Sequence, residues 1–194
     1  MAIKITKKLN IRHILLKLLE KKPFDKITIK DIVETCGINR NTFYYYYSDI
    51  YDLLEEIFKR EMTDIIKTHQ GGGSWLAAFM KVAEVAYSHK KIINNICSSR
   101  SYDYFENYMY KSCKYIVVDF VQAMASGMNV PDEDIEFIAS FYEYALFGMI
   151  SEWFRTGMRE DPEHLAGQLW LVVDNIRYSL RRSERRARLG GNYI

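Results

Sequence analysis

Residues 28–54 constrain the fold more than any other part of the chain. They read TIKDIVETCGINRNTFYYYYSDIYDLL, in which Ile29, Ile32 and Val33 recur at helical spacing ahead of Gly37. A glycine at that point permits the tight turn by which a second short helix crosses the first. The pattern is typical of a helix-turn-helix and indicates binding to DNA.

Capping residues mark where the helices of this segment begin. Thr28 with Asp31 three residues later forms a capping-box pattern. Asn39 is placed to cap the next helix, which we expect to end near Tyr46. Asp49 can cap a longer fourth helix that reaches about Thr68.

The rest of the chain is also helical in pattern, because apolar residues return every three or four positions and strand signals are scarce. Glycines 71–73 interrupt this pattern, and Ser74 is positioned to cap a new helix. The sequence therefore predicts an all-α protein. Besides the helices above, we expect helices at about 7–21, 74–88, 102–125, 132–158 and 162–182.

Charge is distributed unevenly along the 194 residues. Residues 1–60 carry 12 Lys or Arg against 8 acids, 61–180 carry 10 against 16, and 181–194 carry 5 against 1. A basic first segment beside an acidic middle suits a polyanion-binding head on a body with another task, although a solvated charged surface gives the same counts.

Several classes of function lack their sequence signals. Cys36, Cys97 and Cys113 show no CxxC spacing, which disfavours a zinc site or a disulfide framework and favours small core residues. No catalytic constellation, cofactor or metal motif is evident, so we expect no enzyme and no cofactor. No apolar run approaches the about 18 residues that span a bilayer, which predicts a cytoplasmic protein without membrane contact.

The last two long helices are apolar on more than one face, with Ile138, Leu146, Met149, Leu169 and Val173 among the expected buried positions. A helix of this kind has two surfaces to cover. The second surface either meets another copy of the chain or packs inside one larger monomeric core.

The chain resembles the TetR family of bacterial transcription factors, chiefly over residues 11–54. The resemblance lies in an Ile- and Leu-rich first helix, the entry at residues 24–28, the Gly37 turn, Thr42-Phe43-Tyr44 and the closing Leu53-Leu54. The fragments FYYYYSDIYDLLEEIF and ISEWFRTGM are similar to a subgroup that includes regulators of dihydroxyacetone kinase operons.

This resemblance implies a three-helix DNA-binding head, joined by a long fourth helix to a helical body. Residues 1–50 would form the helix-turn-helix domain, and residues 51–194 the effector-binding and dimerisation domain. It also implies a homodimer whose last two long helices form a four-helix bundle. The dimer would present two recognition helices to a near-palindromic DNA operator.

Roles on the recognition helix follow from about 100° of rotation per residue. Phe43 and Tyr47 are four residues apart and are expected to pack inward. Arg40 suits guanine and Asn41 suits adenine, whereas Thr42 and the neighbouring tyrosine hydroxyls suit phosphate. The alternative for the tyrosines is an aromatic cluster that only consolidates the head. The predicted DNA-binding residues are Thr28, Lys30, Asn39, Arg40, Asn41, Thr42, Tyr44, Tyr45 and Tyr46.

One position departs from the family pattern. Many members carry a phosphate-gripping lysine at the start of the fourth helix, where this chain has Ile50. Backbone N–H groups at that helix end offer another way to bind phosphate. Asp49 and Asp52 oppose it, so affinity would depend on Lys7, Lys8, Lys30 and Arg40. We expect modest, salt-sensitive binding to DNA.

The resemblance further implies a small-molecule pocket between the middle helices. Aromatic residues of this region suit an apolar or planar effector, although an aromatic stripe also suits a filled core. The predicted ligand-binding residues are Trp75, Phe79, Tyr87, Tyr104, Phe105, Tyr108, Met109, Phe141 and Tyr142.

The primary hypothesis is a dimeric repressor that a small-molecule effector releases from its operator. The alternative is a co-regulator that acts mainly through a protein partner, and it is this partner that senses the effector. Loss of the lysine at position 50 favours the alternative.

Overall fold

The computed structural model describes residues 2–69, 75–100 and 102–189. Side chains are described from Lys7 onward within these ranges, apart from residues 62, 64–69 and 75–78. Glycines 71–73 and the proposed cap Ser74 lie outside the described residues. The described part is helical and contains no strand, which confirms the predicted all-α class.

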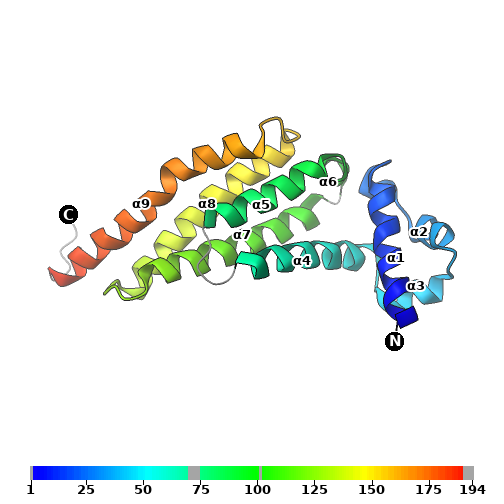
Figure 1. Cartoon of the computed structure of the whole chain (residues 1–194), viewed down its shortest axis with the longest axis horizontal. Helices are drawn as coiled ribbons and strands as arrows, with labels where there is room; N and C mark the ends of the chain where they lie inside the picture. Colours follow the sequence, from blue (N-terminus) through cyan, green and yellow to red (C-terminus); the bar gives the residue numbers. More distant parts are fainter. Residues whose placement is uncertain (1, 70–74, 101, 190–194) are drawn as a thin grey trace.

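Three helices and one short turn form a head at one end of the molecule (Figure 1). Its elements are α1 (Ala2–Leu19), η1 (Phe24–Lys26), α2 (Ile29–Cys36) and α3 (Arg40–Tyr46). Helix α1 buries Ile11, Leu15 and Leu19, which lie at i, i+4 and i+8 on one face. The first helix ends two residues earlier than predicted.

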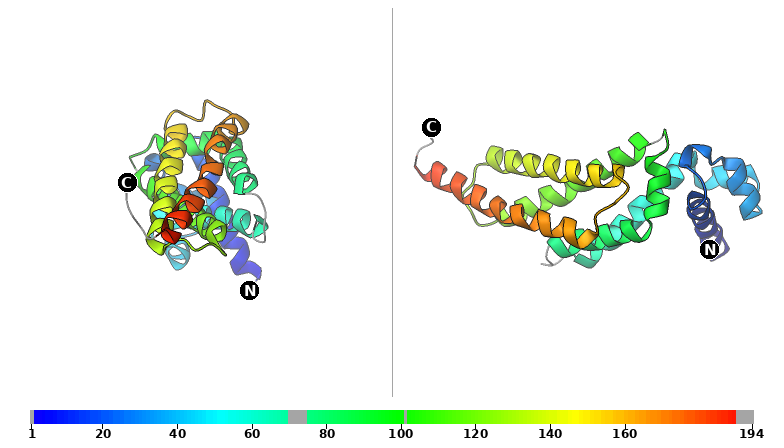
Figure 2. Two further views of the ribbon diagram at one scale, coloured as in Figure 1. Left: turned by 90° about the vertical axis from the view of Figure 1, so that its left-hand side faces the viewer. Right: turned by 90° about the horizontal axis from the view of Figure 1, so that it is seen from above.

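Helix α4 (Ile50–His69) leads from the head into a body of longer helices (Figure 1). The body contains α5 (Trp75–Ser88), α6 (Lys90–Cys97), α7 (Tyr102–Ala125), α8 (Asp132–Arg155) and α9 (Pro162–Arg188). Helix α6 was not predicted, and α9 continues further than expected. The C-terminal end of α9 lies at the end of the molecule opposite to the head (Figure 2).

The core of the body follows a four-residue spacing along α7. Phe105, Met109, Cys113, Val117 and Val121 are all buried there. Facing α7, helix α8 buries Ile138, Leu146 and Phe154. One expected core position is wrong: Met149 of α8 is 37% exposed, and it borders a small cavity that α7, α8 and α9 line.

Ion pairs attach the head to α4. Glu56 of α4 lies 3.0 Å from the Arg12 guanidinium and 2.7 Å from the Lys8 ammonium, both on α1. The Lys8 ammonium also sits 5.5 Å from the centre of the Tyr47 ring. Arg12 is buried, so its charge depends on Glu56 for compensation.

Two further contacts join the head to the body. The Tyr51 ring of α4 packs edge-on against Phe24 at 5.3 Å between centroids and stacks on Tyr104 of α7 at 4.4 Å. On α6, the Asn95 amide donates a 2.7 Å hydrogen bond to the carbonyl oxygen of Leu19, at the end of α1. The head is therefore in direct contact with α4 and α6, and Tyr51 of α4 links it to α7.

Glu56→Ala is expected to lower the free energy of unfolding by about 1–3 kcal/mol, because it leaves the buried Arg12 charge without its carboxylate. Urea denaturation followed by circular dichroism measures this change. Glu55→Ala is the matched control, since Glu55 is exposed on the same helix and pairs only with Lys59, at 2.8 Å. Equal effects of the two substitutions would contradict the prediction.

Candidate nucleic-acid interface and apolar cavity

The start of α2 is fixed by the predicted capping box. The Thr28 hydroxyl oxygen accepts from the Asp31 backbone N–H at 3.2 Å, and the Asp31 carboxylate accepts from the Thr28 N–H at 2.8 Å. Asp31 also lies 2.9 Å from the Lys22 ammonium. The hydrogen bond from Lys22, followed by those from Thr28, lowers the pKa of Asp31 to about 2.

The turn between α2 and α3 depends on Gly37, as predicted. Its backbone has φ of +65°, in the left-handed region that side chains rarely tolerate. The Ile38 N–H then donates to the carbonyl oxygen of Val33 at 3.0 Å, which closes the end of α2. This geometry redirects the chain into α3 within three residues.

Helix α3 is held by its cap and by two buried rings. The Asn39 side-chain oxygen accepts from both the N–H and the hydroxyl of Thr42, at 2.8 and 2.9 Å. Phe43 and Tyr47 are buried, which confirms their predicted inward packing. Tyr47 lies just past the helix, where its ring tilts against Phe43 at 5.8 Å.

The other side chains of α3 face outward. Tyr44 is 53% exposed and Tyr45 is 63% exposed, and the Tyr45 ring meets half-buried Tyr46 edge-on at 4.9 Å. Arg40 and Asn41 are exposed at the start of the helix. A guanidinium, an amide and several phenols are thus presented together on one short rigid helix.

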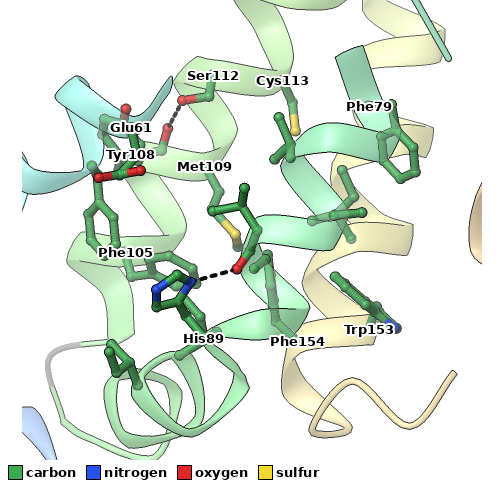
Figure 3. A pocket seen from close by; sticks show the side chains of 18 of the residues that line it. Glu61, Phe79, His89, Phe105, Tyr108, Met109, Ser112, Cys113, Trp153 and Phe154 are labelled. Carbon is green, nitrogen blue, oxygen red and sulfur yellow. Dashed lines mark hydrogen bonds between the residues drawn. The ribbon is translucent and has the colours of Figure 1, made fainter. Parts of the chain in front are cut away.

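In the body, helices α4 to α8 line a cavity of about 210 Å³ that is partly open to solvent, and Leu16 of α1 contributes to its wall. Figure 3 shows aromatic side chains such as Phe79, Phe105 and Trp153 around it. The lining residues are Leu16, Ile57, Phe58, Glu61, Phe79, Val82, Ala83, Val85, Ala86, His89, Ile92, Ile93, Phe105, Tyr108, Met109, Ser112, Cys113, Ile116, Leu146, Ile150, Trp153 and Phe154.

Comparisons with known proteins agree with this architecture. A family model described as "Bacterial regulatory proteins, tetR family" matches residues 14–57. A second, described as "Transcriptional regulator C-terminal region", matches residues 73–175, which is more than half of the chain. The chain belongs to the TetR family. It is a transcription regulator with a helix-turn-helix DNA-binding domain.

Solved structures share the TetR-family fold. One, named "Dihydroxyacetone kinase operon activator DhaS", is 21% identical with a TM-score of 0.72, and the match covers 90% of this chain and 98% of that one. A TetR transcriptional regulator from Streptococcus agalactiae 2603V is 15% identical with a TM-score of 0.61, covering 94% and 96%. At these identities the likeness concerns the fold alone. No curated protein sequence matches the chain.

The nine predicted DNA-binding residues of this TetR-family protein lie on two elements. Thr28 and Lys30 stand at the start of α2, where Thr28 serves as the cap and Lys30 lies 3.8 Å from Glu34. The remaining seven are the cap and the residues of α3 described above. Asn39 and Thr42 already use their polar groups in capping.

The start of α4 bears on the expected phosphate contact. Two of its backbone N–H groups, those of Tyr51 and Asp52, already donate to the Asp49 carboxylate at 2.8 and 2.9 Å. The Asp52 carboxylate in turn accepts from the Ser48 N–H at 2.9 Å. Ile50, which replaces the family lysine, is half-buried against the core.

Four of the nine predicted ligand-binding residues line the cavity: Phe79, Phe105, Tyr108 and Met109. Tyr87 instead stacks outside it on Trp153, with ring centres 6.4 Å apart. Tyr104 is turned toward Tyr51, away from the cavity. The side chain of Trp75 lies outside the described residues.

The two predicted residues on α8 are also elsewhere. Phe141 is 61% exposed. Tyr142 lines a separate, much smaller cavity between α7, α8 and α9. Neither residue borders the larger cavity, whose α8 wall consists of Leu146, Ile150, Trp153 and Phe154.

Sequence reasoning missed the contribution of α4 to the cavity. Ile57, Phe58 and Glu61 line it, and the Phe58 ring lies 5.1 Å from Phe105 and 5.3 Å from Tyr108. A signal existed, because Leu54, Ile57 and Phe58 extend an apolar stripe at helical spacing beyond the head. The cavity therefore borders the helix that carries the head.

The cysteines behave as core residues in the described part of the chain. Burial raises the pKa of the Cys97 and Cys113 thiols to about 12, which keeps them protonated and unreactive.

No described helix is long and apolar enough to cross a membrane. Among the described residues, no cluster of His, Cys, Asp or Glu is arranged to hold a metal ion.

Asp31→Asn is expected to lower the free energy of unfolding at pH 7 by about 0.5–1 kcal/mol, at the low end for a cap because the carboxylate is partly exposed. The folded pKa of about 2 lies below the usual 3.8, so the stabilisation is present above pH 4 and is lost as the pH falls toward 2. Urea unfolding across this range measures the difference between wild type and variant. A difference that stays constant with pH, or an equal effect of exposed Asp25→Asn, would contradict the prediction.

Proposed function

We propose that this chain is a homodimeric repressor that binds a near-palindromic operator and is released by a small-molecule effector. The observation that carries the proposal is that α3 has one buried face, which anchors it, and one exposed face, which carries polar side chains. Phe43 and Tyr47 anchor the helix, whereas Arg40, Asn41 and Tyr44 face outward. The rigid anchor fixes the geometry that base recognition requires.

In this proposal the outward side chains divide the work of recognition. Arg40 reads guanine through two hydrogen bonds, and Asn41 pairs with adenine. Hydroxyls and backbone near the helix start, with Lys30 on α2, contact phosphates and set the register. The proposed contact set is Thr28, Lys30, Asn39, Arg40, Asn41, Thr42, Tyr44, Tyr45 and Tyr46, all within a DNA-binding domain of residues 1–50.

Exposed apolar side chains on α8 and α9 support the dimer. A monomeric protein rarely leaves so many large apolar groups on two adjacent helices. Gly148 of α8 and Gly167 of α9 are exposed in mid-helix, with open space where a side chain would point, which permits close approach of a partner helix. The exposed residues are Phe137, Phe141, Tyr144 and Met149 of α8, and Trp170, Leu171, Val172 and Tyr178 of α9.

The position of the cavity supports control by an effector. The effector would bind in the cavity of the proposed effector-binding domain, residues 51–194. Its wall includes Ile57, Phe58 and Glu61 of α4 and Leu16 of α1. A ligand that binds more tightly when α4 is in one of two placements relative to the body favours that placement, and so changes the separation of the two heads in the dimer. Heads at the wrong separation cannot occupy successive major grooves together.

A second candidate is a co-regulator that needs a protein partner to sense the effector and hold DNA. The start of α4 favours it, because Ile50 carries no charge and the N–H groups of Tyr51 and Asp52 are already used. The similar structure named DhaS is described as an operon activator, which also fits a role other than simple blocking of polymerase.

Selection from random DNA duplexes separates the two candidates. Purified protein alone should enrich a two-fold symmetric site at roughly physiological salt, and then protect that site from nuclease. Failure of a folded dimer to enrich any site, with protection restored by a partner, would replace the first candidate with the second.

Arg40→Ala is expected to weaken binding to the selected site by about ten- to hundredfold and to relax preference at one base position in each half-site. Fluorescence anisotropy with matched and mismatched duplexes measures both effects. Arg159→Ala removes an exposed arginine of the loop between α8 and α9, and should leave affinity and preference unchanged. Unaltered preference in the Arg40 variant would reject its role in reading bases.

Phe141→Glu is expected to convert the dimer into a 22.9 kDa monomer at micromolar concentration, because it places a charge in the proposed interface. Sedimentation velocity measures the change, and circular dichroism should remain helical because Phe141 is exposed in the single chain. Tyr115→Glu, an exposed aromatic position on α7, is the control and should stay dimeric. A dimeric Phe141 variant would exclude this face as the interface.

A further inference from the structure

Among the described residues that line the cavity, five side chains carry nitrogen or oxygen: Glu61, His89, Tyr108, Ser112 and Trp153. The Ser112 hydroxyl donates to the carbonyl oxygen of Tyr108 at 3.0 Å, and the Trp153 N–H donates to the carbonyl oxygen of Glu160 at 2.9 Å. Both donors are therefore engaged within the protein. No lysine or arginine occurs among the lining residues that the structure describes.

Glu61 differs from its neighbouring acids on α4. Glu56 is paired with Lys8 and Arg12, and Glu55 is paired with Lys59. Within the described part of the chain, no ion pair or hydrogen bond reaches the Glu61 carboxylate. Figure 3 shows Glu61 at the side of the cavity where Tyr108 lies.

The rest of the wall also suits positive charge. Six aromatic rings line the cavity, and the negative face of an aromatic ring attracts a cation within about 6 Å. An anion would meet these rings and the carboxylate without a compensating lysine or arginine. The rings belong to Phe58, Phe79, Phe105, Tyr108, Trp153 and Phe154.

A second carboxylate lies behind this wall. Glu143 of α8 is only 2% exposed, and its Oε1 atom has no hydrogen-bond partner in the described structure. Burial, followed by the neighbouring Glu143 carboxylate, raises the pKa of Cys113, which lines the cavity. Glu143 itself does not line the cavity.

Cavity size limits the ligand. A cavity of about 150 Å³ lined by apolar residues holds a benzene ring. The 210 Å³ here accommodates about one or two fused rings with a short substituent. The apolar wall requires that most of the ligand be hydrocarbon.

We propose that the cavity binds an aromatic or similarly apolar compound that carries a single positive charge, with the charge placed at Glu61 of α4. This inference rests on the proposed function, in which the occupant of the cavity is the effector. Because Glu61 belongs to the helix that carries the head, a cation bound there acts directly on the element whose position sets the separation of the two heads.

Three probes of one shape and different charge test this inference. They are 1-naphthylmethylammonium, neutral 1-naphthalenemethanol and anionic 1-naphthaleneacetate, each titrated into the full-length protein by calorimetry. We expect the ammonium compound to bind at least fivefold more tightly than the alcohol, and the carboxylate to bind most weakly. An alcohol that binds as tightly as the ammonium compound would overturn the proposal, and so would lack of binding by all three.

Glu61→Gln should abolish the preference for the ammonium compound while leaving the affinity for the alcohol unchanged. Glu55→Gln is the control on the same helix, because Glu55 does not line the cavity, and it should keep the preference. Circular dichroism establishes that both variants are folded. Retention of the preference in the Glu61 variant would overturn the role assigned to this carboxylate.

DNA release distinguishes this inference from the proposed function. The ammonium compound is added to the protein bound to its selected duplex. A charge preference that depends on Glu61 supports the inference even where DNA stays bound, in which case the effector-release part of the proposed function fails. If the alcohol and the ammonium compound bind the protein with equal affinity and both release it from DNA, effector release is supported and the inference is overturned.

Discussion

The ion pairs that Glu56 makes with Arg12 and Lys8 join the head to α4, the helix that leads into the body. Arg12 is buried, so the head cannot leave α4 without exposing or orphaning a charge. On the same helix, Ile57, Phe58 and Glu61 follow within five residues and border the cavity. A helix is stiff over so short a distance, so in the proposed mechanism a displacement at the cavity reaches the head without an intervening loop. Tyr51 of α4 meets Phe24 of the head edge-on and stacks on Tyr104, which links the head to α7 through α4.

Helix α3 shows the same dependence on its surroundings. Seven residues are too few for a stable isolated helix in water, so its geometry comes from the Asn39 cap and from the buried rings of Phe43 and Tyr47. The run of four tyrosines thereby acquires different roles by position alone. Tyr47 belongs to the core, Tyr46 is half-buried, and Tyr44 and Tyr45 face solvent. A cluster that looks uniform in sequence is thus divided between stability and recognition.

The head could be predicted from the sequence because its determinants are local. The capping box at Thr28, the left-handed Gly37 and the Asn39 cap each act within about four residues. The residues of the cavity wall could not be predicted in this way, because two residues adjacent in sequence can face different parts of the structure. Phe105 faces the cavity, whereas Tyr104 faces Tyr51. Glu61 gave no signal of its own, because a carboxylate on an amphipathic helix normally faces solvent, and only the packing of α7 against α4 identifies it as part of a wall.

The charges of the head serve its fold before they serve DNA. Lys8 forms an ion pair with Glu56, and Lys22 forms one with Asp31. At the start of α4, the Tyr51 N–H donates to the Asp49 carboxylate. Among the described residues of the head, the exposed lysines and arginines without an ion pair are Lys7, Lys17, Lys21 and Arg40, and Lys30 lies 3.8 Å from Glu34. Each neutralised phosphate contributes about 0.9 to the salt dependence of the binding constant, so this small number of cations predicts modest binding to DNA by a single head. In the proposed dimer, pairing two heads adds to this affinity, and the separation set by α4 is then the quantity on which the proposed effector acts.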